Sequence, residues 1–282
     1  MILPKVVQTT AAVAMHYDEL DVFYREIWGE HVHHGFWETG RESATEATEA
    51  LIRKLAARLE FQPGQAVCDI GCGYGATAAY FAAHYGVEVT GFTVSAAQAA
   101  RGPAGGGVTI LCEDWLANSQ PAGKFARAYA VESSEHMPDK QVFFDQAFRV
   151  LAPGGRLCVC AWLAADAPRG WEVRHLLEPI CREGRLPGMG TEAEYDALAR
   201  RAGFAPGASD DLSSRVSRTW WICLWRMLRG IASKPGYAKF LLDARAGNRV
   251  FALTLPRLIL AYATGAMRYG LLVYDKPSDV NR

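Results

Sequence analysis

The stretch Ala66-Val-Cys-Asp-Ile-Gly-Cys-Gly-Tyr-Gly75 decides the fold. Its first five residues are a short apolar run of strand length, and three alternating glycines follow at once. A helical pattern continues over 76–85, and a second strand pattern covers 87–92. Strand, glycine turn, helix and strand in such close succession predict a βαβ unit, the building block of a parallel sheet with crossover helices.

The same alternation continues toward the C-terminus. The pattern predicts strands at 108–112, 126–131, 156–162 and 268–274, a helix at 140–151, and a turn at Pro153-Gly-Gly155. Residues 1–60 are predicted to be helical, with an apolar stripe at helical spacing over 46–59. Residues 164–265 are predicted to be mostly helical and include the Trp-rich segment Thr219–Ile231 and an apolar helix after Asn248. We expect one α/β domain with a helical cap.

The charge balance and the apolar content exclude several classes of protein. The 282 residues carry 30 Lys and Arg against 30 Asp and Glu, so no basic field favours nucleic acid. Half of the residues are apolar, which is too many for a disordered chain. The N-terminus lacks the continuous apolar segment of a secretory signal, and the apolar stretch 258–267 is about half of a membrane span. We expect a cytoplasmic enzyme without a transmembrane segment.

The cysteines and histidines do not form a metal-binding pattern. Seven cysteines, an odd count without paired CxxC units, argue against a disulfide framework and against a zinc site. His31, His33 and His34 cluster near the N-terminus, but no carboxylate or thiol pattern accompanies them. No metal is therefore expected.

The glycine loop suits a positively charged ligand. Without a Cβ atom, glycines let the backbone approach a ligand closely, although a tight strand-to-helix turn is the alternative explanation. The spacing is G-x-G-x-G, unlike the G-x-G-x-x-G of dinucleotide folds. Asp69 at the strand end places a negative charge beside the loop, which repels phosphate and suits an ammonium group. S-adenosylmethionine, with its sulfonium and α-amino groups, satisfies this electrostatic requirement.

At this loop the sequence resembles a known family. Val67-Cys-Asp-Ile-Gly-Cys-Gly-Tyr-Gly75 resembles the first motif of the class I S-adenosylmethionine-dependent methyltransferases. The resemblance implies that the methionine portion of the cofactor is held by Asp69, Gly71, Gly73 and Gly75.

Two later motifs extend the resemblance to the rest of the cofactor. Val89-Thr-Gly-Phe-Thr-Val-Ser95, followed by Gln98, is similar to a form seen in tocopherol methyltransferases and cyclopropane-fatty-acid-synthase-like enzymes. It implies that Thr93 and Gln98 bind the ribose hydroxyls. Glu113-Asp114-Trp115 resembles the adenine motif, with Asp114 on the exocyclic amine and Trp115 against the ring. One departure is the short, glycine-rich segment between Gln98 and Val108, where the family has a longer helix.

The subfamily is indicated by the fourth strand and the N-terminus. The segment 131–140, Val-Glu-Ser-Ser-Glu-His-Met-Pro-Asp-Lys, resembles the fourth-strand motif of γ-tocopherol methyltransferases and their small-molecule relatives. His31-Val-His-His-Gly-Phe-Trp37, with Tyr17 and Trp28 upstream, resembles the N-terminal lid of the same group. The resemblance places Tyr17 in the cofactor site.

The resemblance implies both a fold and a reaction. The expected fold is a Rossmann-like, doubly wound, mostly parallel sheet of seven strands with N-terminal lid helices and a helical cap. Its expected parts are the lid (1–60), the cofactor-binding core (61–163), the cap and acceptor region with part of the sheet (164–265), and a closing strand and tail (266–282), together one compact unit. The expected reaction is methyl transfer from S-adenosylmethionine to an apolar, aromatic small molecule, at a phenolic oxygen or an activated ring carbon.

Attack by a phenol favours a nearby base. Ionising a phenol with a pKa near 10 costs about 4 kcal/mol at pH 7. His136 is the first candidate, because its motif lies past the carboxyl end of the fourth strand, where such sheets bind ligands. Glu132 and Glu135 are expected to orient His136 or to bind the acceptor. The alternative is that His136 caps the following helix or tethers the loop.

Several lid and cap residues are candidates for binding the acceptor. They are His33, His34, Trp28, Trp220 and Trp221. For the histidines, the alternative is packing of the lid against the cofactor. For the segment Thr219–Ile231 three interpretations stay open: core packing, a wall of an aromatic-lined acceptor pocket, or contact with a membrane surface.

Other functions remain open at this point. Within methyl transfer the alternatives are N-methylation of an amine or alkaloid and methylation of a sugar hydroxyl. From another class comes a fold that binds the cofactor without catalysis. A nicotinamide oxidoreductase is opposed by the glycine spacing. The expected partner is an apolar small molecule, with no nucleic acid and with peripheral membrane contact as an option, in a monomer or a homodimer.

Overall fold

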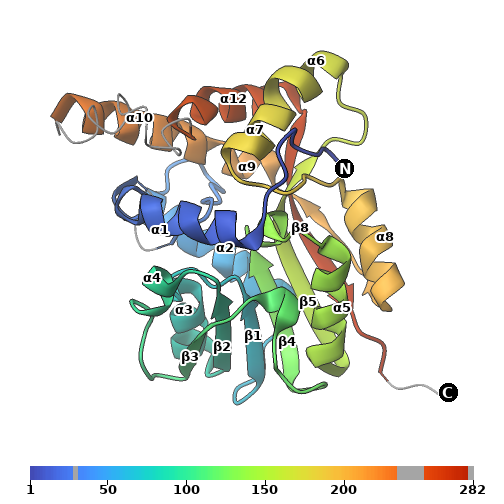
Figure 1. Ribbon diagram of the computed structural model, residues 1–282. Helices are drawn as coiled ribbons and strands as arrows, with labels where there is room; N and C mark the ends of the chain where they lie inside the picture. The colour runs from blue at the N-terminus through green and yellow to red at the C-terminus, as the bar shows by residue number, and fades with distance from the viewer. Residues whose placement is uncertain (28–30, 234–250, 279–282) are drawn as a thin grey trace.

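A single mixed sheet runs through the centre of the molecule, with helices on both faces (Figure 1). The computed structural model describes residues 1–27, 31–233 and 251–278. The strand order is β3-β2-β1-β4-β5-β8-β6, and β7 also pairs with β8. The strands are β1 (Ala66–Ile70), β2 (Glu88–Thr93), β3 (Val108–Cys112), β4 (Phe125–Val131), β5 (Leu151–Ala164), β6 (Ala205–Pro206), β7 (Asp210–Asp211) and β8 (Met267–Asp275).

The first five strands are parallel, and this arrangement fixes where a ligand can bind. β1 lies between β2 and β4, with Asp69 opposite Gly91 on one side and Tyr129 on the other. The chain order reverses at this point, since β2 and β3 extend to one side and β4 and β5 to the other. Open α/β sheets bind ligands outside the carboxyl ends of the strands at such a switch point. The expected doubly wound α/β fold is confirmed.

Two details of the sheet differ from the expectation. The sheet has eight strands rather than seven, because β6 and β7 are separate two-residue strands that both pair antiparallel with β8. In addition, β5 begins at Leu151, and Pro153-Gly-Gly155 lies within it. The register between β4 and β5 shifts there, from Phe125 opposite Leu151 to Arg127 opposite Arg156. The predicted turn is therefore a bulge inside a longer strand.

The helices cover the two faces and one end of the sheet (Figure 1). They are α1 (Thr10–Ile27), α2 (Ala44–Leu59), α3 (Ala76–Tyr85), α4 (Ala96–Ala99), α5 (Lys140–Val150), α6 (Gly170–Glu172), α7 (Glu178–Glu183), α8 (Glu192–Ala202), α9 (Ser213–Val216), α10 (Arg218–Ser233) and α12 (Phe251–Thr264). Short 3₁₀ turns lie at Trp115–Ala117 (η1) and Ser134–His136 (η2), and a π-helical turn at Val173–Leu177 (η3). α4 spans only four residues, which is consistent with the shortened segment after Gln98.

The N-terminal region is only partly helical. Residues 1–9 are extended, and Ile2 pairs with Met189 through two backbone hydrogen bonds. Residues 31–43 form a loop between α1 and α2. The expectation of helix over residues 1–60 is wrong for these segments, because Pro4 and the closely spaced glycines of the loop oppose helix formation. α2 begins where Ser43 and Glu46 form a capping box.

Three apolar clusters hold the molecule together. One packs α5 and α8 on one face of the sheet, and the second packs α2 and α3 on the other. The third lies among the helices after β5 and includes Leu177, Trp220, Leu258 and Met267. Among the helices that the structure describes, none has the length and apolarity needed to cross a membrane.

Candidate functional site

A cleft of two adjoining compartments lies at the carboxyl ends of the parallel strands. The first compartment, about 740 Å³ with its open mouth, reaches from Thr93 and Trp115 to His136. The second, about 390 Å³, is lined by Asp69, Thr77 and His33 among others. Both compartments share the same four lining residues, Val32, Gly71, Gly73 and Val131. The cleft is therefore continuous around the glycine loop.

The glycine loop needs its glycines for both conformation and space. Gly71, Gly73 and Gly75 all have positive φ angles, between 54° and 81°. A Cβ atom on Gly71 would lie 2.3 Å from the Cβ of Ser133. Gly75 is the N-cap of α3. A Cβ atom on Gly75 would lie 2.9 Å from Pro103, whereas Gly73 has only Gln98 Nε2 at 4.0 Å, so the positive φ angle is what favours glycine at position 73.

Asp69 is a buried carboxylate at the edge of the second compartment. Tyr129, its register partner on β4, donates a 2.8 Å hydrogen bond to Asp69 Oδ2. Burial raises the pKa of Asp69 to about 7, and the Tyr129 hydrogen bond opposes that rise only in part. A cation beside Asp69 would restore its charge, which is the role expected for the α-amino group of S-adenosylmethionine.

A polar chain closes the first compartment at the end of β2. Thr93 donates to Gln98 Oε1 at 2.8 Å, and the Gln98 backbone N–H donates to Ser95 Oγ. Ser95 in turn donates to Asp18 of α1. Thr93 and Gln98 both line the compartment, so the two residues expected at the ribose lie side by side.

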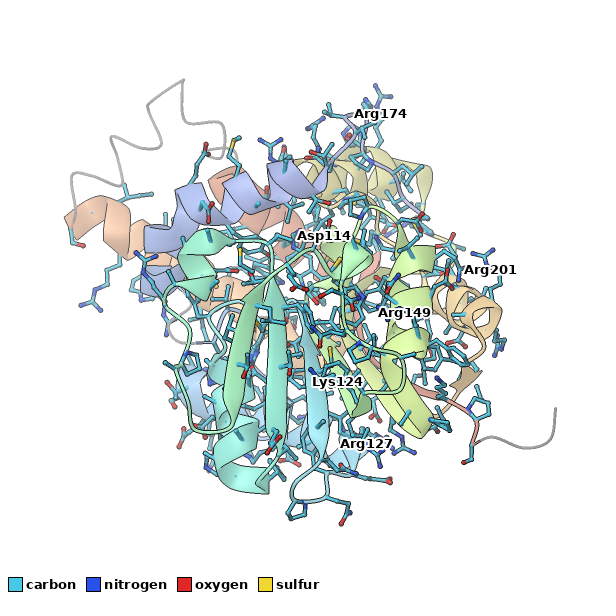
Figure 2. All side chains as sticks on the ribbon, turned by 60° about the horizontal axis from the view of Figure 1, so that its bottom comes forward. Asp114, Lys124, Arg127, Arg149, Arg174 and Arg201 are labelled. Atoms are coloured by element: carbon cyan, nitrogen blue, oxygen red, sulfur yellow. The ribbon has the colours of Figure 1, made fainter. Side chains whose placement is uncertain are left out.

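The next strand supplies the far wall of the first compartment. Figure 2 shows Asp114 at the end of the sheet that α1 covers, whereas Arg127 lies at the opposite end. Asp114 Oδ1 accepts the Leu116 N–H and caps η1. Trp115 is buried, and its indole N–H donates to Phe143 O. Both residues line the compartment, together with Glu113.

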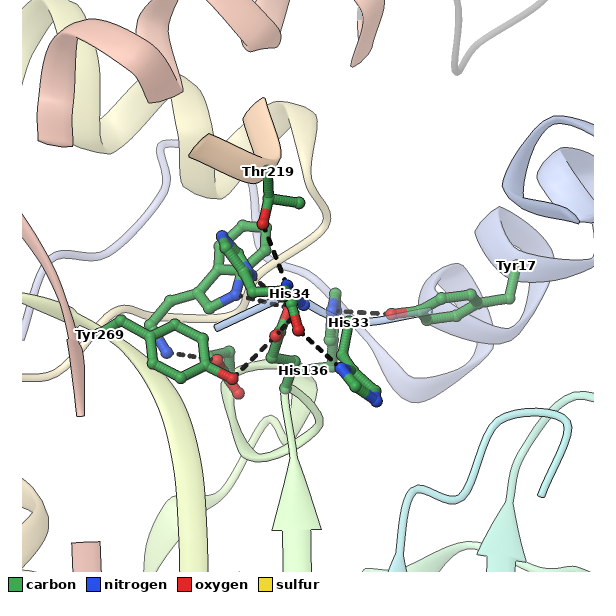
Figure 3. Close-up of polar contacts among 10 residues, drawn as sticks. Tyr17, His33, His34, His136, Thr219 and Tyr269 are labelled. Atoms are coloured by element: carbon green, nitrogen blue, oxygen red, sulfur yellow. Dashed lines mark hydrogen bonds and ion pairs between the residues drawn. The ribbon is translucent and has the colours of Figure 1, made fainter. Parts of the chain in front are cut away.

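The helix α1 covers the cleft and reaches His136. Thr10, Val13 and Tyr17 line the first compartment from this helix. The Tyr17 hydroxyl lies 3.0 Å from His136 Nε2, and the two rings meet edge to face (Figure 3). The structure thus brings Tyr17 and His136 together, although they are 119 residues apart. Trp28 lies outside the described residues.

Glu132 is the centre of a hydrogen-bond cluster just past β4. Its Oε1 accepts from the His34 backbone N–H at 2.7 Å and from the Tyr269 hydroxyl at 2.8 Å. Its Oε2 lies 2.9 Å from both His34 Nδ1 and Trp162 Nε1 (Figure 3). Glu132 also has a positive φ of 52°. Such strain in a residue other than glycine persists only where its surroundings fix it.

This cluster keeps Glu132 ionised. Burial by itself would raise the pKa of Glu132, but the adjacent His34, through its ring and its backbone N–H, outweighs burial and holds the pKa at about 2. With four donors on two oxygens, the carboxylate is a hydrogen-bond anchor for the loop that carries His33 and His34.

Glu135 points into the protein rather than into the cleft. Its Oε1 accepts the Trp162 N–H at 2.5 Å, and its Oε2 accepts from the Ser134 hydroxyl. Burial raises the pKa of Glu135 to about 7. Glu135 does not line either compartment, so the structure separates it from His136 and Glu132 in the cleft.

His33 presents a ring nitrogen at the second compartment. Its Nδ1 lies 2.8 Å from the His34 carbonyl oxygen and is therefore the protonated nitrogen. Its Nε2 is buried and has no hydrogen-bond partner. Burial lowers the pKa of His33 to about 4, with a further contribution from neighbouring His31, so the ring is neutral at pH 7. His33 Nε2 is thus an unused hydrogen-bond acceptor on a residue that lines the second compartment.

The remaining candidates for acceptor binding lie away from both compartments. Trp220 is buried and packs edge to face on the rings of His34 and Trp162. Trp221, its neighbour on α10, is 60% exposed. His34 is held between Trp220 and Tyr269 and reaches the cleft only through its neighbour His33.

Two residues of the site, Tyr129 and Glu113, received no role from the sequence motifs. Tyr129 binds Asp69 only because β1 and β4 are neighbours in register, which the sequence does not reveal. Glu113 lines the first compartment, and its Oε2 is buried without a partner. The acidic pair Glu113-Asp114 is the signal that could have found it.

The residues present fit S-adenosylmethionine. The cleft offers a carboxylate for an ammonium group, side-chain oxygens and an amide for ribose hydroxyls, and a buried, unpartnered carboxylate oxygen beside Trp115 for an amine donor. Gly71 and Gly73 line both compartments, so the backbone of the loop forms part of the cleft wall between these ends. Among the described residues, no three His, Cys, Asp or Glu side chains are arranged to hold a metal ion.

Comparisons with known proteins agree with this reading. A model of the mycolic acid cyclopropane synthetase family matches residues 5–210. The chain is 30% identical to a chloroplastic tocopherol O-methyltransferase of Arabidopsis thaliana, over 94% of this chain and 82% of that protein. It is 33% identical to 27-O-demethylrifamycin SV methyltransferase of Amycolatopsis mediterranei (strain S699), over 75% of this chain and 80% of that protein. The crystal structure of mycolic acid cyclopropane synthase CmaA1, complexed with SAH and CTAB, has a TM-score of 0.84 at 20% identity, covering 96% of this chain and 100% of that one.

Proposed function

The chain belongs to the mycolic acid cyclopropane synthetase family and is an S-adenosylmethionine-dependent methyltransferase, and we propose that it methylates an apolar, aromatic small molecule at a phenolic oxygen or an activated ring carbon. The observation that carries the proposal is the cleft itself. The first compartment of the cleft, beside the residues proposed to bind the cofactor, has apolar walls. Val13, Val32, Val131 and Met137 form them. The tocopherol O-methyltransferase among the relatives is named for a related acceptor class.

The cofactor supplies an electrophilic methyl group on a positively charged sulfur. Asp69 pairs with its ammonium group, and Gly71, Gly73 and Gly75 give it access to the backbone. The ribose hydroxyls bind Thr93 and Gln98. The adenine amine donates to Asp114 or to Glu113, with Trp115 behind the ring. Holding the reacting atoms in line contributes roughly 7–11 kcal/mol to lowering the barrier.

The hydroxyl of a phenol needs a hydrogen-bond acceptor at the cleft. His33 lines the second compartment, and its Nε2 is buried and unpartnered. With a pKa of about 4 the ring is too weak a base to take the proton of a phenol, so we assign His33 the role of accepting the hydrogen bond of the acceptor hydroxyl, while the proton leaves to solvent. A hydrogen bond of this kind contributes about 0.5–1.5 kcal/mol.

His136, Tyr17 and Glu132 position the acceptor and the lid. His136 lines the first compartment and is bound by Tyr17 of α1, so it orients the acceptor from the lid side. Glu132 fixes the loop of His33 and His34 through its four hydrogen bonds. Glu135 stabilises the turn at 134–136.

The chain's thiols support a reducing compartment. All seven cysteines are free, and burial raises the pKa of six of them. We propose that the enzyme works in the cytoplasm, as a monomer or a homodimer.

The test is a transfer assay with S-adenosylmethionine carrying a labelled methyl group. We expect label on a phenol or hydroquinone with a long apolar substituent, and none on a hydrophilic amine or a sugar. His33→Phe should lower kcat by up to about tenfold with an unchanged cofactor Kd. His84→Phe, an exposed histidine on α3, is the matched control and should be neutral. Transfer to amines alone, or equal rates for the two variants, would contradict the proposal.

A further inference from the structure

One face of α10 is exposed and apolar although the rest of the helix is packed. Trp221, Trp225 and Leu228 are 60%, 67% and 49% exposed. Their spacing of four and then three residues puts them on one side of the helix. Thr219, Trp220 and Cys223, on the other side, are buried. Exposed tryptophans gathered on one helix face are unusual in a protein surface and mark a place of contact.

The charged residues of α10 itself are all arginines. Arg218 and Arg229 are exposed on the same side of α10 and lie at either end of the tryptophan pair. Arg226 adds a third cation to the helix. Residues 218–233, which form α10, contain three arginines and no Asp or Glu, whereas the whole chain has no net charge. α10 is therefore a positively charged helix.

This combination matches an anionic lipid surface. Tryptophan and leucine side chains bury into the boundary between headgroups and acyl chains, and arginine binds the headgroup phosphates while its stem stays among apolar groups. α10 lies at the periphery of the molecule, beside α1 and α12 and away from the sheet (Figure 1). It can thus meet a flat surface without displacing the core.

The other side of α10 lines a cavity that borders the candidate site. This third cavity, about 260 Å³, is lined by Ile222, Cys223 and Trp37 among others. His33 lines both this cavity and the second compartment of the cleft. An apolar molecule dissolved in lipid at α10 would therefore be one helix width from the side chain that receives its hydroxyl.

We propose that the exposed face of α10, formed by Arg218, Trp221, Trp225, Leu228 and Arg229, docks the enzyme on an anionic lipid bilayer. The inference that α10 docks on a bilayer is drawn from the exposed side chains of this helix. The purpose of docking, which is access to acceptors dissolved in the bilayer, rests on the proposed function. The binding partner is a bilayer surface, and the helix lies in the interface rather than crossing it.

Flotation with vesicles tests the proposal without any turnover. The full chain should float with vesicles of phosphatidylglycerol and phosphatidylcholine and bind pure phosphatidylcholine at least about tenfold more weakly. Trp221→Ser with Trp225→Ser should abolish flotation. Arg218→Gln and Arg229→Gln should each weaken binding by about fivefold, and high salt should do the same. Trp171→Ser is the matched control, because Trp171 is an exposed tryptophan on α6, outside this face.

Folding of each variant is checked by its S-adenosylmethionine affinity, which these substitutions should leave unchanged. Equal flotation of the wild type and the double tryptophan variant would overturn the proposal. The proposal would also be overturned if the wild type is a dimer that does not float and the double tryptophan variant is a monomer. A second copy of the chain would then cover this face of α10. Because flotation needs no acceptor, a failed transfer assay leaves this result standing, and failed flotation leaves the proposed reaction standing.

Discussion

Asp69 is a residue whose charge depends on what lies beside it. Its pKa of about 7 is raised by burial, so in the empty cleft the carboxyl group is about half protonated at neutral pH. Pairing with a cation requires the ionised form. The proposed pairing of Asp69 with the methyl donor would therefore couple binding to proton release.

This coupling predicts a pH-dependent cofactor affinity. Below a pH of about 7, Asp69 must lose a proton before it pairs, so the S-adenosylmethionine affinity should fall by up to about tenfold per pH unit. Calorimetry between pH 5.5 and 7, in two buffers of different ionisation enthalpy, measures both the affinity and the released protons. Asp69→Asn should bind at least about tenfold more weakly and without proton release. A wild-type affinity that is constant over this range would contradict the role of Asp69.

Glu132 predicts a second pH effect, this time on stability. Its folded pKa of about 2 lies below its ordinary value of 4.5, so the ionised group stabilises the fold by about 3 kcal/mol at pH 7. That contribution is complete above a pH of about 4.5 and is lost as the pH falls toward 2. Glu132→Gln should lower the free energy of unfolding by at least this amount at pH 7, and the difference should shrink at pH 3.

Urea unfolding at both pH values checks this prediction. Glu49→Gln is the control, because Glu49 forms an exposed ion pair with Arg53 along α2 and should change stability by about 0.5 kcal/mol or less. A Glu132→Gln variant as stable as Glu49→Gln at pH 7 would show that the cluster does not hold the 31–34 loop.

At the scale of the element, the glycine loop depends on space as well as on backbone freedom. Gly71→Ala would combine a positive φ with a Cβ atom 2.3 Å from Ser133. Gly64→Ala combines a similar φ of 78° with open space. We expect Gly64→Ala to cost about 1 kcal/mol of stability and to leave cofactor affinity unchanged.

Gly71→Ala should cost more stability and weaken S-adenosylmethionine binding at least about tenfold, since β1 and the turn after β4 must move apart. Adding Ser133→Gly to Gly71→Ala should restore part of the lost stability and part of the lost cofactor affinity. Denaturation and calorimetry measure the two quantities. Identical effects of the two alanine substitutions would mean that the contact with Ser133 is unimportant.

The elements themselves were largely predictable. Strand 66–70, helix 76–85 and strand 108–112 occur with the predicted bounds, because each is a local apolar pattern bordered on at least one side by glycine. The bulge at 153–155 was not predictable, because the same proline and glycines also suit a turn. The two short edge strands β6 and β7 exist only through pairing with β8, which has no local signal.

The site was predictable to the extent that it is local. Thr93 and Gln98 are five residues apart and meet as the motif implies. The Glu132 cluster was not foreseen, because it joins His34, Trp162 and Tyr269 from segments 30 to 137 residues away. The sequence left open which tryptophans of 219–231 are exposed, because the segment is apolar over most of its circumference; the structure buries Trp220 and exposes Trp221.

On the scale of the whole molecule, the cleft is built from distant parts of the chain. α1 and the 31–34 loop supply one side, and the strand ends supply the other. A ligand that binds all of them stabilises the native state by mass action. S-adenosylmethionine at about 100 times its Kd should add about 2.7 kcal/mol, which raises the Tm of a chain of this size by roughly 5 °C.

Thermal unfolding with and without the cofactor measures this shift. NAD at the same concentration is the control ligand and should leave the Tm unchanged, because the loop lacks the dinucleotide spacing. Asp69→Asn should show a much smaller rise with S-adenosylmethionine. A Tm that responds equally to both ligands would contradict a cleft selective for the methyl donor.

The convergence of three distant chain segments on Glu132 constrains how this enzyme can change. A substitution of His34, Trp162 or Tyr269 alone would leave a buried charge short of a donor, so these positions can only diverge together. A library of variants meant to alter the choice of acceptor would therefore randomise the apolar wall residues Val13, Val32 and Met137. It would keep Glu132, His34, Trp162 and Tyr269 fixed.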